Sequence, residues 1–123
     1  TGAPAVDFKY IFFRGGSNVT VNEYAQGTST IVGQANAEGA IAVGAVLFKN
    51  TPPFGLDTPT PASFSSRGGA TVNGELRNKP DLCAPNGVNT TVELGGNPTI
   101  DNDEFPNFSG TSAAAPYGVA AVA

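Results

Sequence analysis

The end of the chain is the feature that most restricts its fold, because residues 108–123 carry no charged side chain. Alanine is frequent after Thr111, and this composition favours a helix. A short helix without a polar face is unsuited to water, so we expect it to be buried on all sides within a larger body. Pro116 cannot donate a backbone hydrogen bond to the carbonyl of Ser112, and the start of this helix should therefore be irregular.

Strand patterns lie in the first half of the chain, separated by turn-rich stretches. Residues 8–14 are aromatic and β-branched, which predicts a half-buried strand. Residues 40–47 form a continuous apolar run, as expected of a strand covered on both faces in a parallel sheet. Residues 50–61 hold four of the ten prolines and predict a surface loop. A short apolar piece surrounds Leu82, and residues 87–103 are again loop-like.

The composition excludes several kinds of chemistry. The 123 residues contain no histidine, which is the usual general base near neutral pH and the commonest zinc ligand. A self-contained Ser-His-Asp site or a His-based metal site is therefore impossible. The net charge is −4, and all six Lys and Arg residues lie at or before Lys79, which argues against a nucleic-acid partner. No apolar run is long enough to span a membrane, so we expect neither a membrane span nor a signal peptide.

Two groups of residues have both a structural and a functional interpretation. For Cys83 we favour a buried thiol that packs as a small hydrophobe over a nucleophile, because no basic partner is in view. For Asp101, Asp103 and Glu104 we favour a solvated loop over a calcium site, which needs six or more oxygen ligands. We therefore predict no metal site and no cofactor in these residues.

Thr111 and Ser112 stand at the start of the predicted helix, where such residues often serve as caps. A serine in the first turn also has a free backbone N–H near the positive end of the helix dipole, beside its own Oγ. Gly110 would let a substrate backbone come close, and the alanines that follow would leave room for a base. The pattern leaves two interpretations open, a helix cap and a nucleophile with one oxyanion donor.

Residues 110–116, Gly-Thr-Ser-Ala-Ala-Ala-Pro, resemble the nucleophile motif Gly-Thr-Ser-x-Ala-x-Pro of the subtilisin-like serine peptidases, the subtilases. Residues 41–45, 64–68 and 79–85 resemble, in the same order, segments that precede this serine in the family. The resemblance implies that residues 29–123 are the C-terminal part of a subtilase catalytic domain. The implied fold is α/β, a fragment of a doubly wound, mostly parallel sheet with a buried nucleophile helix at its C-terminal end. Residues 1–28 would be the end of an inserted β-rich segment.

The resemblance also implies roles for individual residues. Ser112 would be the nucleophile and its backbone N–H one oxyanion donor, while Thr111 would support the turn. Gly33 would line the pocket for the substrate residue before the scissile bond. Asn18 is the only positional candidate for the side-chain oxyanion donor, although an ordinary turn asparagine fits its neighbours better. Arg67 would anchor its turn by hydrogen bonds rather than contact substrate.

The catalytic Asp and His motifs of the family, Asp-x-Gly and His-Gly-Thr, do not occur in the sequence. We expect them upstream in a longer chain, and we expect the isolated 123 residues to be inactive. The implied function is that of a serine endopeptidase that cleaves a protein or peptide substrate through an acyl-enzyme. Two alternatives remain, a catalytically inactive subtilase-like binding or scaffold domain and a self-standing module in which Ser112 only caps a helix. The resemblance further implies a secreted or cell-surface protein, with calcium possible in the full-length form.

Overall fold

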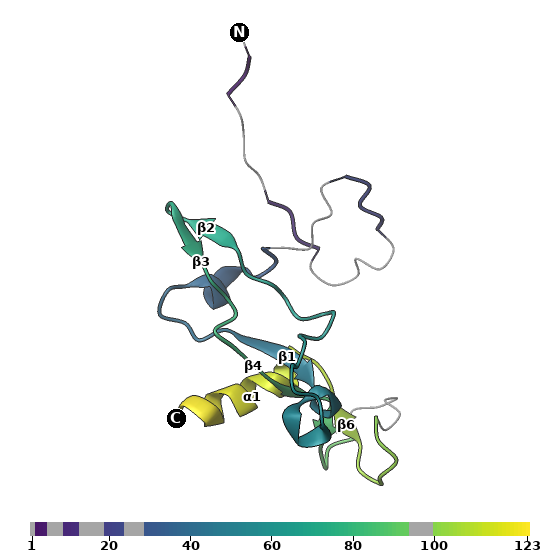
Figure 1. The fold of residues 1–123 in the computed structure, drawn as a ribbon. Helices are drawn as coiled ribbons and strands as arrows, with labels where there is room; N and C mark the ends of the chain where they lie inside the picture. The colour runs from purple at the N-terminus through teal and green to yellow at the C-terminus, as the bar shows by residue number, and fades with distance from the viewer. Residues whose placement is uncertain (1, 5–8, 13–18, 24–28, 94–99) are drawn as a thin grey trace.

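The computed structural model describes residues 2–4, 9–12, 19–23, 29–93 and 100–123. Within them the chain forms short strands, 3-10 turns and one long helix (Figure 1). The strands are β1 (Val43–Leu47), β2 (Ala70–Val72), β3 (Glu75–Arg77), β4 (Leu82–Asn86), β5 (Val88–Asn89) and β6 (Asn107–Phe108). The 3-10 turns are η2 (Gly33–Asn36), η3 (Phe48–Asn50) and η4 (Pro52–Phe54), and the helix is α1 (Thr111–Val122).

The centre of the fold is the parallel pair of β1 and β4. Its register runs from Val43 opposite Leu82 to Leu47 opposite Asn86. The middle of β1 is buried, as its continuous apolar run predicts. The expectation of a strand in residues 40–47 and of parallel pairing is therefore confirmed, and the short apolar piece around Leu82 proves to be its partner.

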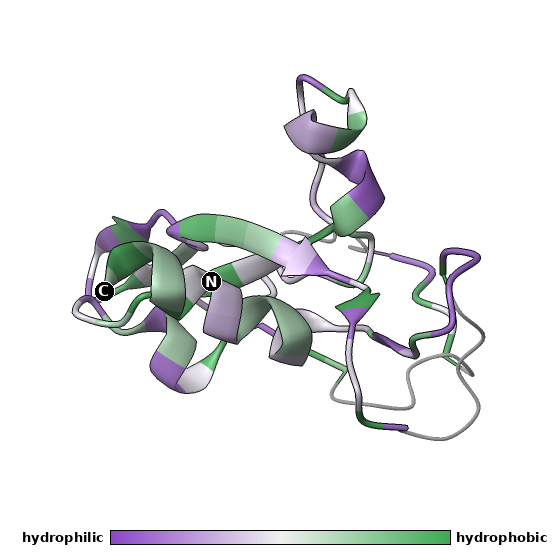
Figure 2. Cartoon of the chain, turned by 90° about the horizontal axis from the view of Figure 1, so that it is seen from below, coloured by the Kyte–Doolittle hydropathy of each residue, from purple (hydrophilic) through white to green (hydrophobic). Residues whose placement is uncertain are grey.

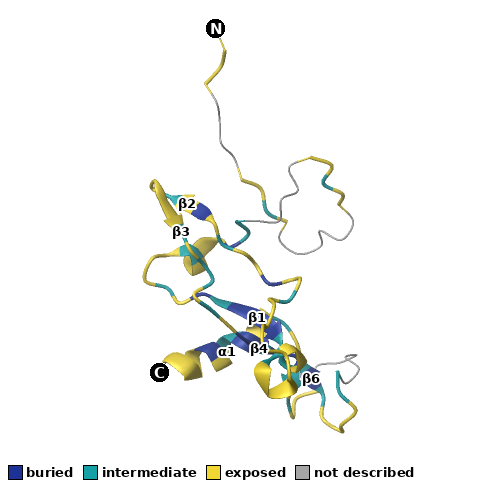
Figure 3. Cartoon of the chain, viewed as in Figure 1, coloured by how far each residue is buried: buried dark blue, intermediate teal, exposed yellow. Residues whose placement is uncertain are grey.

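Helix α1 packs against both strands of this pair through small residues. The buried core consists of Ala45, Ala84 and Ala114, and Figure 3 shows the buried residues gathered where β1, β4 and α1 meet. Gly118 lies so close to the strands that a Cβ there would come within 2.7 Å of a Val43 methyl group. The alanines and this glycine thus allow the helix and the strands to approach closely.

The expectation that α1 is buried on all sides is wrong for the chain as the structure describes it. Only Ala113, Ala114 and Gly118 are buried, and they form one stripe that faces the strands. Val119 on the outer surface is 61% exposed, although the helix carries no strongly hydrophilic residue (Figure 2). The physical reason is that β1 and β4 can cover only one side of a helix.

None of the described helices is long and apolar enough to cross a membrane.

The remaining strands form two small antiparallel pairs, β2 with β3 and β5 with β6. The β2–β3 hairpin turns at Asn73 and Gly74, which both have positive φ, as a two-residue hairpin loop requires. The predicted strand at residues 8–14 is not formed by its described part, residues 9–12, because no described strand pairs with them. Residues 50–61 are mostly exposed, as expected of a surface loop, and contain η4.

Candidate active site at the start of helix α1

The first turn of α1 begins without a capping side chain. Gly110 is the residue before the helix. Its φ of 118° and ψ of 171° form a backbone conformation that residues with a side chain rarely adopt. Thr111 and Ser112 are both exposed, and neither hydroxyl has a hydrogen-bond partner among the described residues. Ser112 is therefore the second residue of the helix, and the cap position belongs to Gly110.

Backbone donors at this helix start are available to a ligand. The carbonyl of Gly110 accepts hydrogen bonds from the N–H groups of Ala113 and Ala114, at 3.1 and 3.3 Å. The N–H of Ser112 has no acceptor among the described residues. A Cβ added at Gly110 would lie 3.8 Å from this nitrogen, so glycine keeps the space beside it open. No acidic side chain lies in the first turn to neutralise the positive end of the helix dipole.

The carbonyl of Ser112 is affected by the proline inside the helix. Pro116 lies within α1 and cannot donate the hydrogen bond that Ser112 C=O would receive in a regular helix. The expected irregularity at the helix start is thus present in the hydrogen bonding, while the helix itself continues to Val122.

The segment that leads into α1 is held by backbone bonds to the chain that follows β4. Gly87 N–H donates to the carbonyl of Phe108 at 3.0 Å, and β5 pairs with β6 beyond it. The side chain of Asn107 is buried and donates to the carbonyl of Gly87 at 3.0 Å and to Asn89 Oδ1 at 2.8 Å. Its Oδ1 accepts from the N–H of Ile100. All these contacts fix the residues immediately before the helix.

Asn86, the last residue of β4, is buried at the same place. The residue is 2% exposed, and its Oδ1 accepts a long hydrogen bond of 3.4 Å from the N–H of Gly110. The Nδ2 group of Asn86 has no hydrogen-bond partner among the residues that the structure describes. An amide so deeply buried with one unpaired group is unusual, because such groups normally find partners. Sequence analysis missed both buried asparagines, since Asn86 before Gly87 and Asn107 after Pro106 are also typical of ordinary turns.

A pocket of about 210 Å³ adjoins the start of α1. It lies beside β1, and its lining includes Val32, Gly44, Ser65 and Thr111. The structure therefore brings together the residues that precede Gly33 and Ser112, although neither of these two predicted site residues lines the pocket itself. Gly33 is exposed, with φ 59° and open space around its Cα. Its role in substrate binding stays a prediction, as does that of Asn18, which lies outside the described residues.

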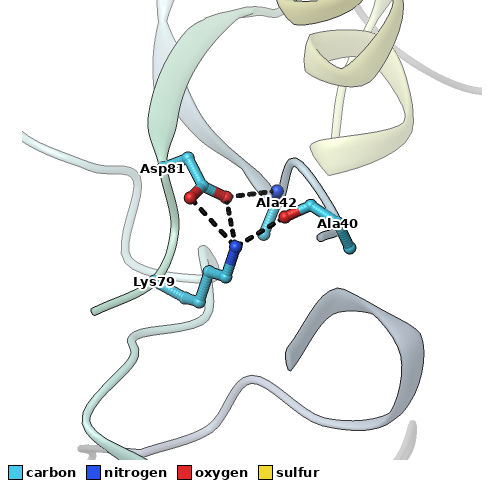
Figure 4. Close-up of polar contacts among 4 residues, drawn as sticks. All are labelled: Ala40, Ala42, Lys79 and Asp81. Carbon is cyan, nitrogen blue, oxygen red and sulfur yellow. Dashed lines mark hydrogen bonds and ion pairs between the residues drawn. The ribbon is translucent and has the colours of Figure 1, made fainter. Parts of the chain in front are cut away.

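The amino end of the β1–β4 pair, where Ala42 and Pro80 also line the pocket, is held by a charged contact (Figure 4). Lys79 Nζ lies 2.8 Å from Asp81 Oδ2 and donates to the carbonyl of Ala40 at 2.5 Å. Asp81 Oδ2 also accepts from the N–H of Ala42 at 2.7 Å. The hydrogen bond from Lys79, followed by that from Ala42, lowers the pKa of the Asp81 carboxyl. This cluster, the Lys79–Asp81 clamp, lies where both strands begin.

The segment at residues 64–68 supports the outer edge of β1. Ser65 is buried, and its Oγ accepts from the N–H of Ala45 at 3.0 Å. Arg67 anchors its turn as expected, but through its backbone: its carbonyl accepts from Thr30 N–H at 2.7 Å, and its N–H donates to Thr30 Oγ1 at 2.8 Å. The guanidinium takes part in no hydrogen bond among the described residues.

The remaining candidates have the following environments. Cys83 is exposed, so the expectation of a buried residue is wrong; its position in β4 turns it away from the core. Neighbouring atoms desolvate its thiol and raise the pKa, which keeps it protonated. Asp103 is bound to Asn89 and to the N–H of Phe105. Within the described residues no group of three or more His, Cys, Asp or Glu side chains could hold a metal ion.

These features define a parallel strand pair packed against a helix whose first turn carries a serine, two residues after a glycine. The profile of the subtilase family matches residues 11–123, and the chain therefore belongs to this family. Family membership makes it a relative of the serine peptidases, and the resemblance of residues 110–116 is confirmed at the level of the family. Comparisons with curated proteins and with solved structures found no match.

Proposed function

We propose that Ser112 is the nucleophile of a serine endopeptidase and that this chain supplies it to a catalytic domain whose base lies outside these 123 residues. The observation that carries the proposal is the exposed Ser112 whose backbone N–H is unpaired beside Gly110. The hydroxyl and the donor belong to one residue, so attack and stabilisation of the oxyanion can occur at one place.

The proposed reaction is acyl transfer from a protein or peptide substrate. Ser112 Oγ attacks the carbonyl carbon of the scissile bond and gives its proton to a histidine supplied by another part of the polypeptide. The developing oxyanion accepts a hydrogen bond from Ser112 N–H. The amine then leaves with the proton, and water hydrolyses the ester formed on Ser112. In this arrangement β1 and β4 belong to a larger, doubly wound parallel sheet, and the exposed side of α1 is covered by the rest of that domain.

The competing proposal is a subtilase-like binding or scaffold domain without peptidase activity. It is favoured by one observation, the lack of any histidine in the sequence. The family also supports export to the cell surface or the medium, which we propose for either function. Detection of the protein in the medium or on intact cells would support export, whereas its retention inside the cell would contradict it.

A fluorophosphonate probe tests the nucleophile directly in the full-length polypeptide. The wild type should be labelled, and Ser112→Ala should lose the label. Ser109→Ala is the matched control, because Ser109 is equally an exposed serine but lies outside the helix, and this variant should label like the wild type. No labelling of the wild type would favour the binding or scaffold domain, and equal labelling of Ser112→Ala would show that the reacting nucleophile is not Ser112.

A further inference from the structure

Asn86 connects the end of β4 to the residue that precedes helix α1. It and Asn107 are the largest fully buried side chains of the described residues, and Asn86 alone of the two contacts Gly110. Gly110 in turn provides the carbonyl that accepts the first hydrogen bonds of the helix. The conformation of the turn before Ser112 therefore depends on where Asn86 Oδ1 holds the N–H of Gly110.

The conformational freedom of Gly110 explains why the contact between its N–H and Asn86 matters. The carbonyl of Gly110 is held by the N–H groups of Ala113 and Ala114, but no side chain limits its φ, and 118° is only one of many values that glycine can adopt. A rotation about Gly110 would change the directions of Ser112 Oγ and of its N–H together. A neutral amide can restrain Gly110 without placing a negative charge beside the forming oxyanion, which a carboxylate in the same place would do.

We propose that Asn86 is a positioning residue for Ser112, acting through the N–H of Gly110. The inference rests on the proposed function of Ser112. The long hydrogen bond and the unpaired Nδ2 indicate that Asn86 is held by its burial at the end of β4 and not by a full set of polar partners. Its contribution to folding through hydrogen bonds is correspondingly small, while its place fixes the turn.

The experiment measures fluorophosphonate labelling kinetics of the full-length polypeptide, per folded molecule. Asn86→Leu keeps the number and branching of the side-chain heavy atoms, with bulkier methyl groups, but offers no acceptor to Gly110. The first-order labelling step should slow by at least about tenfold, because misplacement of a reacting group by an ångström is costly. The concentration dependence of labelling should stay unchanged, since the probe still binds. Asn86→Ala is the second variant, should the leucine variant fail to fold.

The control is Asp81→Asn, which removes a polar contact at the other end of the same strand. It should lower stability while leaving the labelling step unchanged. Asn86 variants that label at the wild-type rate, or an Asp81→Asn variant that slows labelling equally, would overturn the positioning role. The wild type and Ser112→Ala separate this result from the proposed function, because a failure of that proposal leaves the wild type unlabelled or Ser112→Ala labelled like the wild type.

Discussion

Where β1 and β4 begin, their contacts are charged, whereas where they end, the side chains that hold the chain are neutral amides. At the first end the side chain of Lys79, which is 6% exposed, pairs with the side chain of Asp81, which is 38% exposed. At the second end Asn86 and Asn107 are almost completely buried. The charged end thus contributes to stability in a way that depends on pH, and the neutral end leaves the positive end of the helix dipole uncompensated.

This difference indicates that the two ends of the strand pair have different roles. Ligand sites in parallel α/β sheets lie beyond the carboxyl ends of the strands, and the start of α1 lies at that end. A carboxylate there would compete with a substrate oxyanion for the donors of the first turn. We therefore expect changes at the carboxyl end to affect reactivity and changes at the amino end to affect stability.

The largest effect should come from Ser112→Ala in the full-length polypeptide. Removal of the proposed nucleophile should lower kcat for peptide hydrolysis by about 10⁴- to 10⁶-fold. The free energy of unfolding should change by less than about 0.5 kcal/mol, because the side chain is exposed and unpaired. Peptidase assays and urea denaturation followed by circular dichroism would measure both. A large loss of stability in Ser112→Ala would contradict the expectation that changes at the carboxyl end affect reactivity and not stability.

Gly68→Ala should have the largest effect on stability. A Cβ at Gly68 would lie 2.0 Å from the backbone carbonyl oxygen of Lys79, so the chain leading into the clamp must move. We expect a loss of more than about 3 kcal/mol in the free energy of unfolding, or no cooperative folding at all. Gly39→Ala is the control, because nothing lies within 4 Å of a Cβ at Gly39. Equal stability of the two variants would show that this close approach is unnecessary.

Gly118→Ala should have an intermediate effect and tests whether the helix transmits it. The new methyl group would meet Val43 and Leu82, the first residues of β1 and β4. Overpacking should cost about 1–3 kcal/mol, offset in part by the better helix propensity of alanine, about 1 kcal/mol. Urea denaturation would measure the change in stability. Labelling of Ser112 per folded molecule should stay the same, and a slower rate would mean that the helix couples the two ends.

The sequence predicts β1 and α1 well because each depends on a local pattern. An apolar run of eight residues and a run of alanines after Thr111 specify element type without any knowledge of the neighbours. The Asn73-Gly74 dipeptide could also have predicted the β2–β3 hairpin. The burial of α1 could not be predicted in the same way, because it depends on which other elements cover the helix.

The candidate site likewise contains residues that a local motif reveals and residues that only the fold reveals. The motif at residues 110–116 points to Ser112 as the candidate nucleophile, two residues after Gly110. Asn86 and Asn107 gave no such signal, because Asn before Gly87 and Asn after Pro106 also occur in solvent-exposed turns. Only the fold shows that one contacts Gly110 and the other joins the chain before α1 to the segment after β4.

The smallest effect should be the pH dependence that the Lys79–Asp81 clamp adds to stability. The pKa of Asp81 is lowered in the folded chain, so the unfolded chain binds a proton first as the pH falls. The stabilisation is complete above the ordinary carboxyl pKa of about 4 and is lost as the pH falls through the lower folded value. Urea denaturation at pH 7 and in steps below pH 4 should therefore show wild type and Asp81→Asn converging in stability at the acid end. A constant difference in stability between them would mean that Asp81 acts through packing rather than charge. Slower labelling of Ser112 in Asp81→Asn would contradict the assignment of stability to the amino end and of reactivity to the carboxyl end.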